Sequence, residues 1–206
     1  MFENHVLPTS FIFVVAAALA SANVNGVIDQ DASVQKLLER GALDEAVQRA
    51  AGERDNPEST YLAAQALIKK DDSGRAAEEY ARLKESGDGA WKAIGESAAE
   101  VLAGNTDAGM AAAMRAIEAN GDHPYAHYQL GLVASRQQNF ERAAEAFGRA
   151  AELKPDFAYA HYYAGLAHNR LKQIAKMSEH LETFIRLAPE APERTAVMAI
   201  LRTLRP

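Results

Sequence analysis

The chain has 206 residues and a formal net charge of −6, with 48% hydrophobic and 24% charged residues. This balance is typical of a globular protein with a sizeable core and argues against intrinsic disorder. The acidic charge and the absence of any run of five Lys or Arg residues argue against a nucleic-acid or anionic-membrane partner. The sequence contains no cysteine, which excludes disulfides, thiolate nucleophiles and Cys-ligated zinc.

The N-terminal segment is apolar. Residues 11–20 (FIFVVAAALA) carry no polar side chain, and Ala20-Ser21-Ala22 is the small-x-small pattern that a signal peptidase accepts. Residues 1–22 are therefore predicted to be a cleaved secretory signal, which would place the protein in the periplasm or outside the cell. Two alternatives stay open because no Lys or Arg precedes the apolar run. Ser10 could cap a buried apolar helix, or residues 6–28 could anchor the chain in a membrane, and either would leave it cytoplasmic or membrane-anchored.

Between residues 23 and 123, apolar residues recur at helical spacing in short units. Leu37, Leu38 and Ala46 indicate a degenerate helical pair within 23–56. Residues 57–123 are predicted to hold divergent repeats, the second of which begins near Trp91.

The strongest pattern is an internal repetition with an offset of 34 residues, seen when 124–157 is laid over 158–191. The matched pairs are Tyr125 and Tyr159, His127 and His161, Gly131 and Gly165, Arg136 and Arg170, Phe147 and Leu181, and Pro155 and Pro189. A period of 34 with two helices per unit is a signature of a helical repeat array.

These units resemble the tetratricopeptide repeat family, whose pattern is W-x2-L-G-x2-Y, then A-x3-F, then P. The first clear unit supplies His127-x2-Leu130-Gly131, Ala143-x3-Phe147 and Pro155. The resemblance implies an all-α, right-handed superhelix, an α-solenoid of antiparallel helix pairs. Residues 192–206, with apolar residues on one face, are predicted to be the capping helix.

Repeat positions 2, 5, 9, 12 and 13 fall on the side of each first helix opposite its packed side. In tetratricopeptide proteins that side lines the concave groove, and the resemblance implies the same here. The expected groove residues are Tyr125, Tyr128, Leu132, Ser135, Arg136, Tyr159, Tyr162, Leu166, Asn169 and Arg170. Tyrosine and arginine suit peptide recognition, although the tyrosines could instead pack on neighbouring helices. The Lys and Asn with which some family members hold a C-terminal carboxylate are replaced by Tyr128 and Leu132, so an internal segment or a folded surface is the expected ligand.

No catalytic, cofactor-binding or metal site is predicted. His161 and His168 occupy packing positions of the repeat and lack the carboxylate spacing of zinc sites. Ser33-Val34-Gln35-Lys36 matches S-x-x-K, but the motifs that accompany it in β-lactamases are missing. The predicted function is therefore a protein–protein interaction scaffold of a bacterial-type cell envelope, near a membrane through its N-terminal segment, with no nucleic acid or small-molecule substrate. Self-assembly into a homo-oligomer and an enzyme with an unrecognised site are the alternatives.

Overall fold

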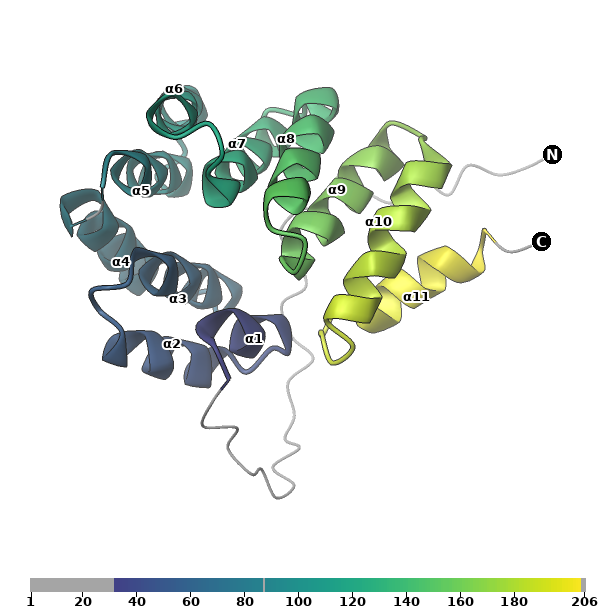
Figure 1. Cartoon of the computed structure of the whole chain (residues 1–206), viewed down its shortest axis with the longest axis horizontal. Coiled ribbons are helices and arrows are strands. Elements are labelled where there is room, and N and C mark those ends of the chain that lie inside the picture. The colour runs from purple at the N-terminus through teal and green to yellow at the C-terminus, as the bar shows by residue number, and fades with distance from the viewer. Residues whose placement is uncertain (1–31, 87, 205–206) are drawn as a thin grey trace, which may run out of the picture.

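The computed structural model describes residues 32–86 and 88–204, and the predicted signal at 1–22 lies outside them. Within the described residues there are eleven helices and no strand (Figure 1). They are α1 (Val34–Glu39), α2 (Leu43–Gly52), α3 (Pro57–Lys69), α4 (Ser73–Ser86), α5 (Gly89–Leu102), α6 (Thr106–Ala119), α7 (Pro124–Arg136), α8 (Phe140–Leu153), α9 (Ala158–Arg170), α10 (Ile174–Leu187) and α11 (Arg194–Arg202). Each helix packs on the next one in the chain. The predicted all-α solenoid of helix pairs is confirmed.

Polar caps and prolines start several of these helices. The side chains of Ser33, Asn56 and Asp88 accept hydrogen bonds from backbone N–H groups in the first turns of α1, α3 and α5. Pro57 and Pro124 occupy the first turns of α3 and α7, where a missing N–H costs nothing. These local signals fix where the first helix of several pairs begins, and we call the first helix of each pair (α1, α3, α5, α7 and α9) its inner helix.

The turn inside each helix pair contains one residue with a positive φ. The five residues are Gly41, Asp71, Gly104, Gln138 and Lys172, with φ between 58° and 90°. Only two of them are glycines. In the other three pairs, a residue with a side chain adopts the left-handed backbone conformation, which costs free energy for L-residues. The regular recurrence of this turn shows that the pairs before residue 124, whose sequences diverge most, share the geometry of the clear repeats.

The helices of the two clear repeats cross where the sequence places a glycine. A Cβ atom built on Gly131 would lie 2.7 Å from the ring of Phe147, and one built on Gly165 would lie 2.7 Å from the side chain of Leu181. Phe147 and Leu181 are both fully buried. The close approach of α7 to α8 and of α9 to α10 therefore requires glycine at both positions.

The solenoid curves tightly enough for its first helices to meet its last ones. Figure 1 shows the helices following one another around a curve that brings α1 back toward α9 and α11. The Gln35 amide donates to the Asp156 carbonyl at 2.9 Å, and the Ala158 N–H at the start of α9 donates to the Glu39 carboxylate at 3.2 Å. Lys69 at the end of α3 pairs with Glu193 at 2.6 Å. We call this set of contacts the closure seam.

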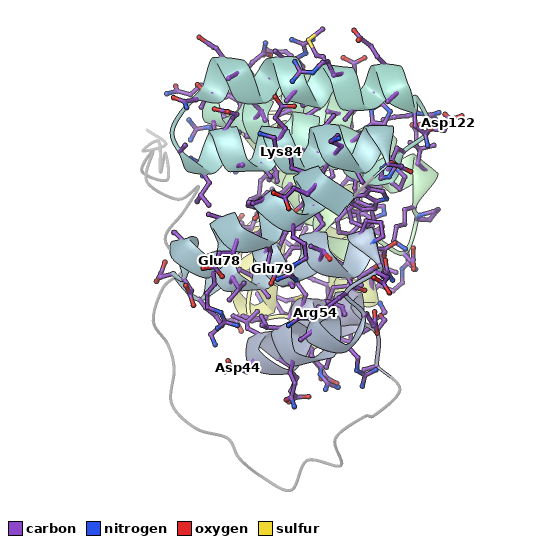
Figure 2. All side chains as sticks on the ribbon, turned by 90° about the vertical axis from the view of Figure 1, so that its left-hand side faces the viewer. Asp44, Arg54, Glu78, Glu79, Lys84 and Asp122 are labelled. Carbon is purple, nitrogen blue, oxygen red and sulfur yellow. The ribbon has the colours of Figure 1, made fainter. Side chains whose placement is uncertain are left out.

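The C-terminal helix α11 lies within the segment predicted to be the cap, and its Val197 and Leu201 are buried. None of the helices in the described residues is both long and apolar enough to span a membrane. The outer face of α2 to α6 carries charges of both signs (Figure 2). Glu79 pairs with Arg82 on α4, and Asp44 pairs with Lys70.

Candidate partner-binding surface

The predicted groove residues divide into a buried set and an accessible set. Tyr125, Tyr128 and Tyr159, all in the N-terminal halves of α7 and α9, expose only 1%, 4% and 2% of their surfaces. They therefore have almost no area to offer to a partner. The interpretation in which tyrosines pack on neighbouring helices describes these three.

Tyr125 is buried by three aromatic rings from other parts of the chain. Its ring centroid lies 5.6 Å from that of Tyr61 on α3, 5.3 Å from Trp91 on α5 and 5.0 Å from Phe157. Its hydroxyl donates a hydrogen bond of 2.8 Å to Glu58. Burial, and then the nearby Glu58 carboxylate, raise the pKa of this phenol far above its usual value, so Tyr125 acts only as a neutral donor.

Tyr159 has an equivalent place on α9. Its hydroxyl donates to Glu193 at 3.1 Å, and the Lys69 ammonium lies 4.4 Å from the centre of its ring. These two residues, Glu193 and Lys69, form the ion pair of the closure seam. Glu58, which accepts from Tyr125, and Glu193, which accepts from Tyr159, are 67 and 34 positions away from these tyrosines in the chain, so repeat positions alone did not reveal them.

A buried polar chain ties the inner helices together. The Tyr61 hydroxyl donates to the side-chain Oε1 of Gln129 at 2.9 Å, and the side-chain Nε2 of Gln129 donates to the Ser97 hydroxyl at 3.2 Å. Ser97 in turn donates to the Gly109 carbonyl at 2.8 Å. Gln129 is 1% exposed, and pairing of this kind is what a buried amide needs. Helices α3, α5, α6 and α7 are thus connected by one buried chain of hydrogen bonds.

The accessible set lies mainly in the C-terminal halves of α7 and α9. Its half-buried members are Leu132, Ser135, Tyr162, Leu166 and Asn169, and its exposed members are Arg136 and Arg170. Leu132 and Leu166, like Arg136 and Arg170, hold equivalent positions of successive repeats. The Arg170 guanidinium lies 4.7 Å from the centre of the Phe140 ring. Partial burial lowers the pKa of Arg136, an effect that the nearby Tyr80 opposes. We call these seven residues the accessible inner surface.

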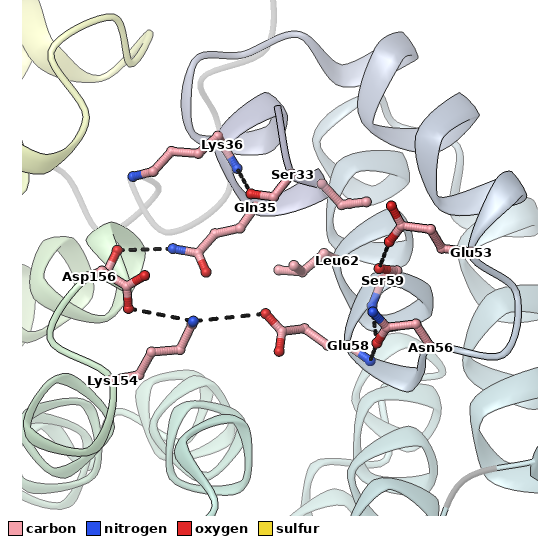
Figure 3. Close-up of a pocket in the computed structure, with 11 residues that line it drawn as sticks. Ser33, Gln35, Lys36, Glu53, Asn56, Glu58, Ser59, Leu62, Lys154 and Asp156 are labelled. Atoms are coloured by element: carbon pink, nitrogen blue, oxygen red, sulfur yellow. Dashed lines mark hydrogen bonds and ion pairs between the residues drawn. The ribbon is translucent and has the colours of Figure 1, made fainter. Parts of the chain in front are cut away.

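A small polar cavity of about 260 Å³ lies at the closure seam (Figure 3). Lys154 lies within it, 3.9 Å from the Glu58 carboxylate and 3.5 Å from the Asp156 carboxylate. Ser59 donates to Glu53 on the opposite wall. The cavity residues therefore mostly satisfy one another, and we assign no ligand to it.

The histidines singled out in the sequence lie between helices. His168 is 8% exposed and donates from Nδ1 to the Gln173 side chain at 2.8 Å. His161 contacts His180 of α10, a residue that the sequence analysis did not consider. Among residues 32–86 and 88–204, no group of three His, Asp or Glu side chains is placed to hold a metal ion.

Comparison with known proteins identifies the repeat. The family model described as "Tetratricopeptide repeat" matches residues 124–157. Residues 124–157 are a tetratricopeptide repeat. This segment consists of α7, α8 and the turn before α9, and the resemblance to the tetratricopeptide repeat family is confirmed. No curated protein matches the sequence.

Several solved tetratricopeptide-type structures are similar in fold. A MamA protein is 20% identical over 75% of this chain and 87% of its own, with a TM-score of 0.47. A second structure, MamA from Desulfovibrio magneticus RS-1 beginning at residue 41 of that protein, is 23% identical over 75% of this chain and 90% of its own, also with a TM-score of 0.47. YrrB, described as a TPR protein with an unusual peptide-binding site, is 18% identical over 76% and 84%, with a TM-score of 0.48.

Proposed function

We propose that the chain is a protein-interaction scaffold that holds a segment of another protein on its accessible inner surface. The observation that carries this proposal is the split of the predicted groove. Tyr125, Tyr128 and Tyr159 are buried among the chain's own aromatic rings, whereas Leu132, Tyr162, Leu166 and Arg170 stay in reach of solvent. The tetratricopeptide repeat at 124–157 supports it.

The chemistry of this surface indicates the kind of segment that it would bind. Leu132, Leu166 and the Tyr162 ring offer apolar area, and Tyr162 also keeps a polar tip for a hydrogen bond. Arg136 and Arg170 are planar donors that match a carboxylate in geometry. We therefore expect a partner segment that carries an apolar side chain close to an acidic one.

The test is capture of partners from the native source, quantified by mass spectrometry, with the full chain as bait. The variant Leu166→Asp plus Arg170→Glu should lose most of the captured partner, because it reverses one charge and removes apolar area. A matched control, Met114→Asp plus Lys84→Glu, makes the same kinds of change at exposed positions elsewhere, and it should retain the partner.

Thermal unfolding of both double variants must be measured beside the capture, since Leu166 is half-buried. Equal capture by the wild type and by a folded Leu166→Asp plus Arg170→Glu variant would contradict the assignment of the surface. Recovery of the chain itself as the captured species would identify the surface as a contact between copies.

We also propose that the protein acts in the cell envelope. The apolar segment 11–20, which ends in the small-x-small pattern Ala20-Ser21-Ala22, supports export. N-terminal sequencing of the natural protein tests this: a mature chain that starts at Asn23 is expected, and one that keeps Met1 or starts at Phe2 would contradict it.

A further inference from the structure

Three imidazole rings meet between α9 and α10. The Nδ1 atoms of His161 on α9 and His180 on α10 lie 3.2 Å apart. The ring of His168, also on α9, stacks on that of His180 with a centroid separation of 5.5 Å and an angle of 16° between the planes. We call these three residues the histidine cluster.

The geometry of the cluster suits neutral rings. A hydrogen bond between two Nδ1 atoms needs one N–H donor and one bare nitrogen, so it is lost when both rings carry a proton on Nδ1. Two protonated rings would point N–H groups at each other across 3.2 Å. In addition, Nε2 of His161 is buried and makes no hydrogen bond. The Pro155 carbonyl nearby favours the protonated form of His161, but less than burial opposes it.

The charged and titratable groups around the cluster come from three helices, α7, α8 and α10. On α10, Glu179 favours protonation of all three rings, Lys176 opposes it at His168 and His180, and Arg186 opposes it at His161. A crevice of about 840 Å³ beside His168 and His180 is also lined by His127 of α7 and by Glu141, Arg142, Glu145, Arg149 and Glu152 of α8.

Burial is the largest effect at each ring and lowers the pKa of all three. The pKa of His180 falls to about 4, because the charges of His161 and His168 add to its burial.

We propose that the histidine cluster makes the α9–α10 pair an acid-sensitive element whose packing loosens as the pH falls. Histidine in an unfolded chain has a pKa of about 6.5, so above about pH 6.5 the neutral cluster contributes its full share to the stability of the fold. Below that pH the unfolded chain takes up protons that the folded cluster resists, so stability is lost as the pH falls from about 6.5 toward about 4. Imidazole is the side chain whose charge changes in this range.

The helix that carries two of the three imidazoles also carries Tyr162, Leu166, Asn169 and Arg170. Acid would therefore also weaken the hold on a partner, a consequence that rests on the proposed function. The acid sensitivity itself needs no partner.

Thermal unfolding of the full chain at pH 7.5 and pH 5.0, followed by circular dichroism, tests the proposal in a way that does not depend on partner binding. Between pH 7.5 and pH 5.0 the unfolding temperature should fall in both proteins, and the fall should be about 3 to 6 °C larger for the wild type than for His180→Gln. The control His127→Gln removes an imidazole that lines the same crevice but belongs to no part of the cluster, and it should behave as the wild type does. His123, whose pKa is lowered by its burial beside Trp91, is present in all three proteins and cancels from the comparison.

Equal pH dependence of the wild type and His180→Gln would overturn the proposal. If His180→Gln does not fold, an NMR titration of the wild-type imidazole signals decides instead. A signal that titrates near pH 4 is expected for His180, and titration of every histidine near pH 6.5 would overturn the proposal.

Discussion

The substitution Gly131→Ala tests the helix crossing on which the repeat geometry depends. A methyl group at residue 131 would lie 2.7 to 2.8 Å from three carbon atoms of the Phe147 ring, well inside van der Waals contact. That ring cannot easily move away, because it is fully buried and lies 5.4 Å from the Tyr163 ring and 5.6 Å from the Tyr128 ring. Overpacking of this kind costs about 1–3 kcal/mol. The better helix propensity of alanine returns about 0.5–1 kcal/mol, so we expect a net loss of about 1–2 kcal/mol.

Gly148→Ala is the matched control for this experiment. Gly148 lies in α8, and a Cβ atom there would meet nothing within 4 Å. This variant should gain up to about 1 kcal/mol from helix propensity alone. Urea unfolding of both variants and the wild type, with the midpoint and slope fitted for each, measures the difference. If the Gly131→Ala variant proved as stable as the Gly148→Ala variant, the reasoning that glycine is needed where α7 crosses α8 would be refuted.

Two further predictions concern the inner face and the turns. The double variant Tyr125→Ala plus Tyr159→Ala should lose cooperative thermal unfolding, because the removal of each buried aromatic ring costs about 3–5 kcal/mol. A double variant with the same unfolding temperature as the wild type would show that these rings are not part of the core. Gln138→Gly should raise the free energy of unfolding by about 1 kcal/mol, because residue 138 has a φ of 60°, and Gly104→Ala should lower it by a similar amount, because residue 104 has a φ of 90°. Urea unfolding measures both changes. If the two changes in free energy had the opposite signs, the turn conformations would differ from those described.

Much of this architecture could be predicted from the sequence because the repeat carries its own geometry. The 34-residue offset aligned Gly131 with Gly165 and Phe147 with Leu181, and these pairs do form equivalent crossings. The face of each inner helix also followed from helical periodicity. What periodicity could not supply is which part of that face stays accessible. That depends in part on contacts outside the two repeats: Tyr125 packs on Tyr61 and Trp91, and Tyr159 contacts Lys69 and Glu193.

Three other features had no clear signal in the sequence. The positive φ at Asp71, Gln138 and Lys172 was hidden because these residues are not glycines. The contact of His180 with His161 joins two helices of one pair, and a search along single helix faces does not find it. The closure seam depends on polar contacts between residues more than 100 positions apart, such as Gln35 with Asp156.

Thiol labelling of single-cysteine variants tests most directly whether the solenoid closes on itself. The sequence contains no cysteine, so the introduced residue is the only thiol that can react. Ala158 is fully buried at the closure seam, where its N–H is bonded to Glu39 of α1, whereas Leu166 lies two turns further along the same helix and is half-buried. In the native full chain, the Ala158→Cys variant should react with a small thiol reagent at least about 100-fold more slowly than the Leu166→Cys variant, because its labelling requires local unfolding. Equal labelling rates at the two positions would contradict the closed curve and, with it, the division of the inner face into a buried and an accessible half.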